Sequence, residues 1–179
     1  DLARLTALDA SGRDISDVGD LLYCSNLREL DLSGNNISSL ETLDNEQLLY
    51  KQRIINDFSR MDSPLNRLLA AFAYAAPPAV HTLNLDGNPL KRVLQMPLRE
   101  LRRLSMRDAR LQFPPRLGDQ PVLESLLLDG NEIHTAGLYI RCPALEELSY
   151  KDNQVTEVSL YMPKTPAREG MRLILTGNP

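Results

Sequence analysis

Residues 27–37 read LRELDLSGNNI, and this stretch decides the fold. Apolar and polar residues alternate through Leu30 and Leu32, which is typical of a short strand with one buried face. Asn35 follows in the ninth place of the pattern L-x-x-L-x-L-x-x-N-x-L. Further copies of this pattern begin at residues 5, 80, 101, 123, 145 and 170. The stretch is therefore one unit of an internal repeat.

The spacing of the copies indicates stacked repeats, because successive starts lie 22, 53, 21, 22, 22 and 25 residues apart. In motif and period the chain resembles the leucine-rich repeat family. It looks most like the short-repeat intracellular class, which includes a phosphatase regulatory subunit and cytoskeletal and flagellar proteins. The resemblance implies an α/β solenoid with a parallel sheet on its concave face and irregular or short helical convex segments. We expect residues 1–179 to be a single such domain, a fragment of a larger protein.

The 53-residue step contains an insertion, which we place at residues 41–79. Apolar residues at helical spacing predict one helix over 44–58 and a second over 63–76. A rival parsing treats 58–68 as a degenerate repeat, with Asn66 in the ninth place. Two roles for the helical insertion around 44–76 stay open, namely packing on the solenoid and forming an interaction surface.

The composition narrows the class of protein. A hydrophobic content of 42%, a charged content of 25% and a net charge of −4 are ordinary for a globular domain and argue against direct binding of nucleic acid. No run of 18 apolar residues exists, so we expect no membrane span. Cys24 and Cys142 occupy equivalent places four repeats apart, a separation of roughly 20 Å that is too long for a disulfide. Two unpaired cysteines suit a reducing compartment.

No catalytic motif accompanies the repeats. Phosphate-loop, zinc-protease and paired-cysteine patterns are missing from the sequence, and His81 and His134 lie in different repeats. We therefore predict no catalytic residues, no metal site, no cofactor and no enzymatic activity. The ninth-place asparagines predict a structural ladder that bonds the backbone of adjacent turns, and Ala109 interrupts it. Its members are Asn35, Asn88, Asn131, Asn153 and Asn178.

The third, fifth and seventh places of each motif should face outward on the sheet, and we call this the concave face. The pattern predicts an acidic zone over the first three repeats and a basic row of Arg102, Arg103, Arg107 and Arg110 in the fourth. We expect Leu127 to be an exposed apolar anchor for a partner. The candidate protein-binding residues are Asp9, Glu29, Asp31, Asp86, Arg103, Arg107, Leu127, Asp129 and Lys151. A solvated face with partly compensating charges is the alternative.

The resemblance implies a non-catalytic protein-interaction scaffold or adaptor. We expect it to use its concave face, to be cytoplasmic, and to associate with the cytoskeleton, a centrosome or a flagellum. Two alternatives are a subunit like the tubulin-folding cofactors, which residues 138–155 resemble, and a splicing-factor-like subunit. In each case the partner is a protein, with no direct nucleic acid and no membrane. The oligomeric state is left open by the sequence.

Overall fold

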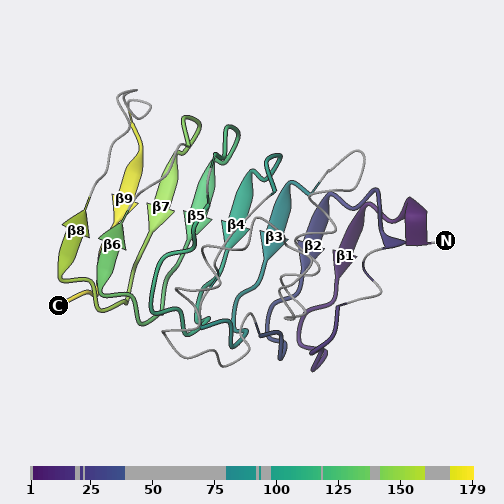
Figure 1. Cartoon of the computed structure of the whole chain (residues 1–179), viewed down its shortest axis with the longest axis horizontal. Coiled ribbons are helices and arrows are strands. Elements are labelled where there is room, and N and C mark those ends of the chain that lie inside the picture. The colour runs from purple at the N-terminus through teal and green to yellow at the C-terminus, as the bar shows by residue number, and fades with distance from the viewer. Residues whose placement is uncertain are drawn as a thin grey trace, which may run out of the picture.

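The computed structural model shows the chain as a row of parallel strands, with β1 and β9 toward opposite ends of the stack (Figure 1). It describes residues 2–18, 21, 23–38, 80–91, 93, 98–117, 119–137, 142–159 and 170–179. A short 3-10 helix, η1 (Leu2–Arg4), precedes the main sheet. The strands of that sheet are, in spatial order, β1 (Ala7–Asp9), β2 (Glu29–Asp31), β3 (Thr82–Asn84), β4 (Arg103–Ser105), β5 (Ser125–Leu127), β7 (Glu147–Ser149) and β9 (Arg172–Ile174). The predicted parallel solenoid is confirmed.

The strands pair in the register of the repeat, so equivalent residues lie side by side. The central leucine of each strand is aligned with that of the next, for example Leu104 with Leu126 and Leu126 with Leu148. These leucines are fully buried in the middle of the stack, whereas Leu8 and Leu173 in the two end strands are only half-buried. Each repeat therefore covers its neighbour, and the core extends along the stack.

The insertion does not interrupt the sheet. β2 pairs directly with β3, with Leu30 aligned to Leu83, although 53 residues separate Leu30 from Leu83 in the chain. This pairing leaves no place in the main sheet for a strand between β2 and β3, which the rival parsing of 58–68 as a repeat would require. Residues 58–68 themselves lie outside the described residues. The two predicted helices, 44–58 and 63–76, lie outside the described residues.

A second, two-stranded parallel sheet lies beside the main one, formed by β6 (Thr135–Gly137) and β8 (Glu157–Ser159). We expected irregular or short helical segments here, and that expectation is wrong for these two return segments. Each strand begins four residues after a ladder asparagine, β6 after Asn131 and β8 after Asn153. Because this offset is the same, the two strands run alongside each other, with Ala136 aligned to Val158. Ala136 is buried in the hydrophobic core, whereas Val158 is 45% exposed.

Both cysteines are buried in the core and neither is in a disulfide. Their carbonyl groups play the same role, since Leu27 N–H donates to Cys24 O and Leu145 N–H donates to Cys142 O, each at 3.1 Å. Burial raises the pKa of the Cys24 thiol and raises that of Cys142 to about 12. The buried thiols therefore remain protonated and act as small apolar side chains.

A left-handed residue occupies the eighth place of every repeat, immediately before the asparagine place. The φ angles there run from 49° at Asp108 to 78° at Gly177. Glycine fills five of the seven places, and Asp108 and Asp152 fill the other two. In every repeat before that of Gly177, the N–H of this residue donates to the seventh-place carbonyl of the next repeat, as Gly87 does to Arg107 O at 2.8 Å. The glycines are thus structural turn residues, because glycine adopts positive φ without strain.

Replacing Gly87 with alanine should lower the free energy of unfolding by about 1–2 kcal/mol, because φ is +65° there. An added Cβ would lie 3.5 Å from the Gly34 backbone, an ordinary contact, so the loss comes from the dihedral angle. Chemical denaturation measures the change. Gly87→Asn is the matched control and should lose less, since asparagine tolerates this region. Equal losses for the two variants would show that crowding, not the left-handed conformation, sets the effect.

Candidate protein-binding face

The asparagine side chains join each strand end to the preceding repeat. Asn35 Oδ1 accepts from the N–H groups of Arg13 and Ile15, at 3.0 and 2.9 Å. Its Nδ2 group donates to Leu32 O and, in the preceding repeat, to Ala10 O. Asn88, Asn131, Asn153 and Asn178 form equivalent bonds. These bonds hold the ends of the strands that carry the concave face.

Ala109 takes the asparagine place in the fourth repeat, and it is completely buried. The neighbouring asparagines serve the carbonyls on either side of it. Asn88 Nδ2 donates to Leu85 O at 3.1 Å, and Asn131 Nδ2 donates to Met106 O at 2.8 Å. Leu90 N–H donates instead to Asn88 O within a tight local turn. The two carbonyl groups and the Leu90 N–H therefore remain hydrogen-bonded, although the fourth repeat has no asparagine.

The outward residues form three rows across the strands. In the third-place row, Glu29 on β2 is separated from Arg103 on β4 by Thr82 on β3. In the fifth-place row, Asp9 lies beside Asp31. The seventh-place residues follow the strands and run from Ser11 and Ser33 through Asp86, Arg107, Asp129 and Lys151 to Thr176. The register thus places the nine candidate residues on one face in the predicted order.

The aspartates of this face also bond their own neighbours. Asp86 Oδ1 accepts from Ser105 Oγ at 2.6 Å and from Arg107 N–H at 2.7 Å. Asp129 Oδ1 accepts from Ser149 Oγ and Lys151 N–H in the same arrangement. These two carboxylates are half-buried and tie one repeat to the next. They are therefore less available to a partner than the sequence suggests.

The acidic end of the face is more open. Asp9 is exposed, and hydrogen bonds from the Ser11 hydroxyl and then the Ser11 N–H lower its carboxyl pKa. Asp31 Oδ2 accepts from Asn84 Nδ2 at 3.0 Å, which joins β2 to β3. Glu29 is exposed and has no ion-pair partner among the described residues. Negative charge therefore remains accessible over β1 and β2.

The four arginines of the basic row do not act alike. Arg102 pairs with Glu124 at 2.7 Å. Arg107 Nε lies 3.2 Å from Asp129 Oδ2, an ion pair without good hydrogen-bond geometry. Arg110 is exposed and has a positive φ of 56°. Arg103 and Arg110 have no ion pair with a described residue, and of these two exposed arginines only Arg103 lies on a strand of the sheet, β4.

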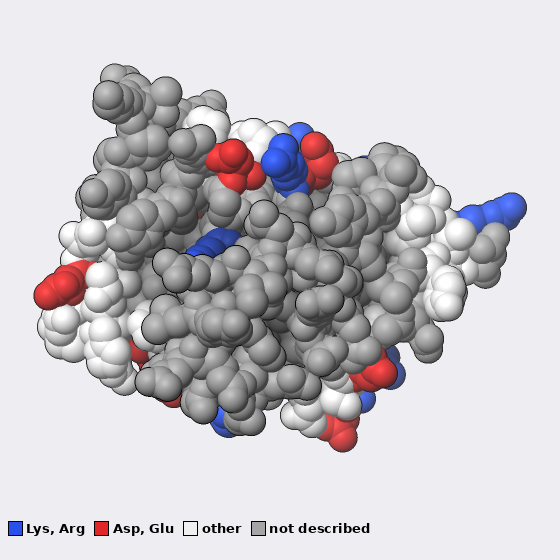
Figure 2. Space-filling model, viewed as in Figure 1, with Lys and Arg blue, Asp and Glu red and all other residues white. Residues whose placement is uncertain are grey.

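Leu127 differs from expectation because it is half-buried. It stands between Ser105 and Ser149 in the fifth-place row, and the adjacent strands cover part of its side chain. Glu147 forms an ion pair with Arg172 at 2.7 Å, which the motif of a single repeat does not predict. Both residues occupy the third place of their motifs, so aligning the columns of the repeat would have found it. Figure 2 likewise shows acidic and basic side chains next to each other at the upper margin of that view.

The described residues show no grouping of histidine, cysteine or acidic side chains that could hold a metal ion. Across the same part of the chain, no helix has the length and apolar character needed to cross a membrane.

Comparisons with known proteins agree with the fold. A family model described as leucine rich repeats, in two copies, matches residues 3–45. A leucine-rich repeat protein of Leptospira interrogans has a similar structure, with a TM-score of 0.50 and 19% identity over 88% of this chain and 34% of that one. The motif, the solenoid and these matches identify the chain as a leucine-rich repeat protein.

The chain spans about a third of the Leptospira protein, 34% of its length, and at this identity the likeness concerns the fold alone. An internalin C2 from Listeria monocytogenes is 19% identical, over 99% of this chain and 82% of that one, with a TM-score of 0.34. No curated protein sequence matches the chain significantly.

Proposed function

We propose that this chain is a non-catalytic interaction module that binds a segment of a protein partner along its concave face. One observation carries the proposal. Exposed Glu29 and exposed Arg103 stand in one row without ion-pair partners among the described residues. By contrast, Arg107 on the same face is paired with Asp129. Unpaired charges of opposite sign on a rigid sheet suit a partner with the complementary order of charges, because such charges set register and association rate.

The bound segment should carry a basic residue over β1 and β2 and an acidic residue over Arg103. Asp9, Glu29 and Asp31 supply the negative end. Leu127 offers a half-buried apolar contact one strand beyond Arg103, with Asp129 and Lys151 following it. The partner segment is thus an extended or helical stretch with separated charges of opposite sign and an apolar residue after the acidic one.

Charge reversal at Arg103 tests this proposal. The wild-type chain, Arg103→Glu and Arg116→Glu would be immobilised, and proteins captured from a cell lysate quantified by mass spectrometry. We expect a specific partner to be retained by wild type and Arg116→Glu and reduced about fivefold or more by Arg103→Glu. Arg116 is a matched control, because it is exposed, lies off the strands and gives the same change in net charge. Equal capture by all three proteins would contradict the proposal.

We further propose a cytoplasmic scaffold or adaptor role associated with the cytoskeleton, a centrosome or a flagellum. Its support is the resemblance of the 22-residue repeats to the short intracellular class. Fluorescence imaging of the full-length protein tests it, and exclusive localisation in another compartment would contradict it.

A further inference from the structure

A pocket of about 340 Å³ opens beside β6, away from the residues of the concave face. Its lining comes from return segments of three successive repeats. The residues are Gln112, Phe113, Glu132, His134, Thr135 and Gln154. All six are exposed at the surface, so the pocket is open to a partner.

Backbone hydrogen bonds between repeats hold the lining in place. Glu132 N–H donates to Leu111 O at 2.9 Å, and Gln154 N–H donates to Ile133 O at 3.1 Å. Each bond joins the segment just after one ladder position to the repeat before it. The spacing of the lining side chains is therefore set by the solenoid, and the site is pre-organised.

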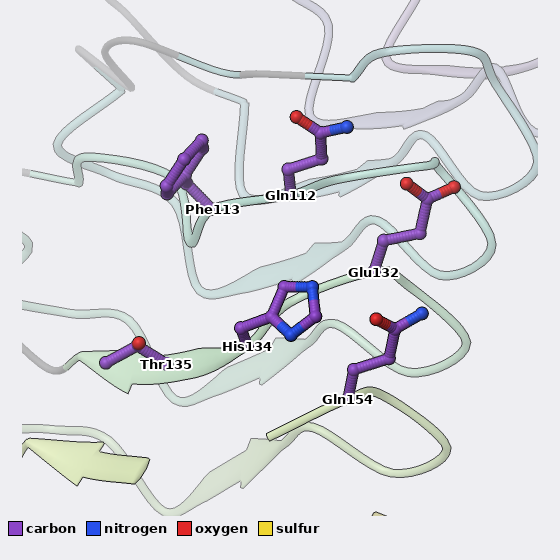
Figure 3. Close-up of a pocket in the computed structure, with 6 residues that line it drawn as sticks. All are labelled: Gln112, Phe113, Glu132, His134, Thr135 and Gln154. Carbon is purple, nitrogen blue, oxygen red and sulfur yellow. The ribbon is translucent and has the colours of Figure 1, made fainter. Parts of the chain in front are cut away.

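The lining side chains place several hydrogen-bond acceptors on one side of the pocket. Figure 3 shows the side chains of Gln112, Glu132 and Gln154 projecting in the same direction. The His134 ring lies near the side chains of Glu132 and Gln154, and Phe113 lies on the opposite side of the pocket. Glu132 supplies the one carboxylate of the lining and forms no ion pair with a described residue. Both glutamine amides can turn an oxygen inward, and Thr135 adds a hydroxyl.

We propose that this pocket binds an arginine side chain from a protein partner. A guanidinium group is planar, carries five donors and stacks on aromatic faces. Glu132 matches its charge, the glutamine oxygens match its remaining donors, and the exposed Phe113 side chain lines the same pocket. Lysine fits less well, because an ammonium is a compact, strongly hydrated charge that uses neither the spread of acceptors nor the ring. This second contact is independent of the proposed binding on the concave face.

Short capped peptides test the pocket directly. The probes are acetyl-Gly-Arg-Gly-amide and its lysine and citrulline counterparts, titrated into the isotope-labelled chain and followed by NMR. The arginine peptide should shift the backbone amides of Gln112, Glu132 and Gln154 most. Citrulline has the same shape without the charge. The citrulline peptide should bind about fivefold more weakly, which is the loss of affinity expected when one exposed ion pair is removed.

The substitution Glu132→Gln should weaken the arginine peptide by about the same fivefold factor. Glu100→Gln is the matched control, since Glu100 is exposed and outside the pocket, and it should leave the affinity unchanged. Equal affinity for arginine and citrulline, or no effect of Glu132→Gln, would overturn the proposal. Tighter binding of free arginine than of the capped peptide would overturn the assignment to a protein partner. Arg103→Glu should bind the peptide normally, which separates this test from that of the concave face.

Discussion

Replacing Asn131 with alanine should lower the free energy of unfolding by about 3 kcal/mol, because the substitution strands three buried backbone groups. Asn131 Oδ1 accepts from the N–H groups of Ala109 and Leu111, both at 2.9 Å. Its Nδ2 group donates to Met106 O at 2.8 Å. Leu128 O also loses a bond to Asn131, but Asn153 Nδ2 still donates to it. The loss is largest here because Ala109 supplies no amide in the repeat before.

Urea denaturation followed by circular dichroism measures this change, with Asn178→Ala as the control. Asn178 is only half-buried, in the last strand-bearing repeat. Its loss affects Val155 N–H and Leu175 O, which water can reach more easily, so we expect about 1 kcal/mol. Similar losses for the two variants would mean that the stability contributed by a ladder asparagine does not depend on how deeply it is buried between repeats.

The regular part of the fold was predictable because one local pattern repeats. Each motif specifies a strand, its inward leucines and a turn, and equal spacing then aligns Leu104, Leu126 and Leu148 without further information. The alternate use of glycine and aspartate in the turn was not predicted. The side chain of Asp108 extends over Gly130, where any Cβ would collide with it. This dependence between neighbouring repeats is invisible within a single motif.

The position of the candidate face could be predicted from the sequence, but the availability of its charges to a partner could not. The motif shows which residues point outward, but it does not show which charges neutralise each other. The Arg107 side chain turns toward Asp129 in the next repeat, while Arg103 finds no such partner among the described residues. The pocket beside β6 was missed for another reason. Its residues follow Ala109 and the ladder asparagines Asn131 and Asn153, in return segments where the leucine pattern no longer applies.

Leu126→Ala should destabilise the chain by about 3 kcal/mol through the cavity it leaves. Leu126 is completely buried at the middle of β5, and the aligned leucines Leu104 and Leu148 flank it on both sides. Backbone pairing fixes the spacing of the three strands, so the neighbours cannot close the space. Leu173→Ala is the control, because Leu173 is half-buried in the end strand and should lose about 1 kcal/mol. Chemical denaturation of both variants measures the difference.

Hydrogen exchange should also show which strands are destabilised by the loss of the Leu126 side chain. In a stack where each repeat contacts only its neighbours, stability is a sum of repeat and interface contributions. A cavity in β5 weakens its interfaces with β4 and β7. Amide exchange should therefore accelerate most in these three strands and least in β1, which is separated from β5 by β2, β3 and β4. Uniform acceleration along the sheet would instead show that the solenoid opens as one cooperative unit, in which case a central and a terminal cavity would act on the same global equilibrium.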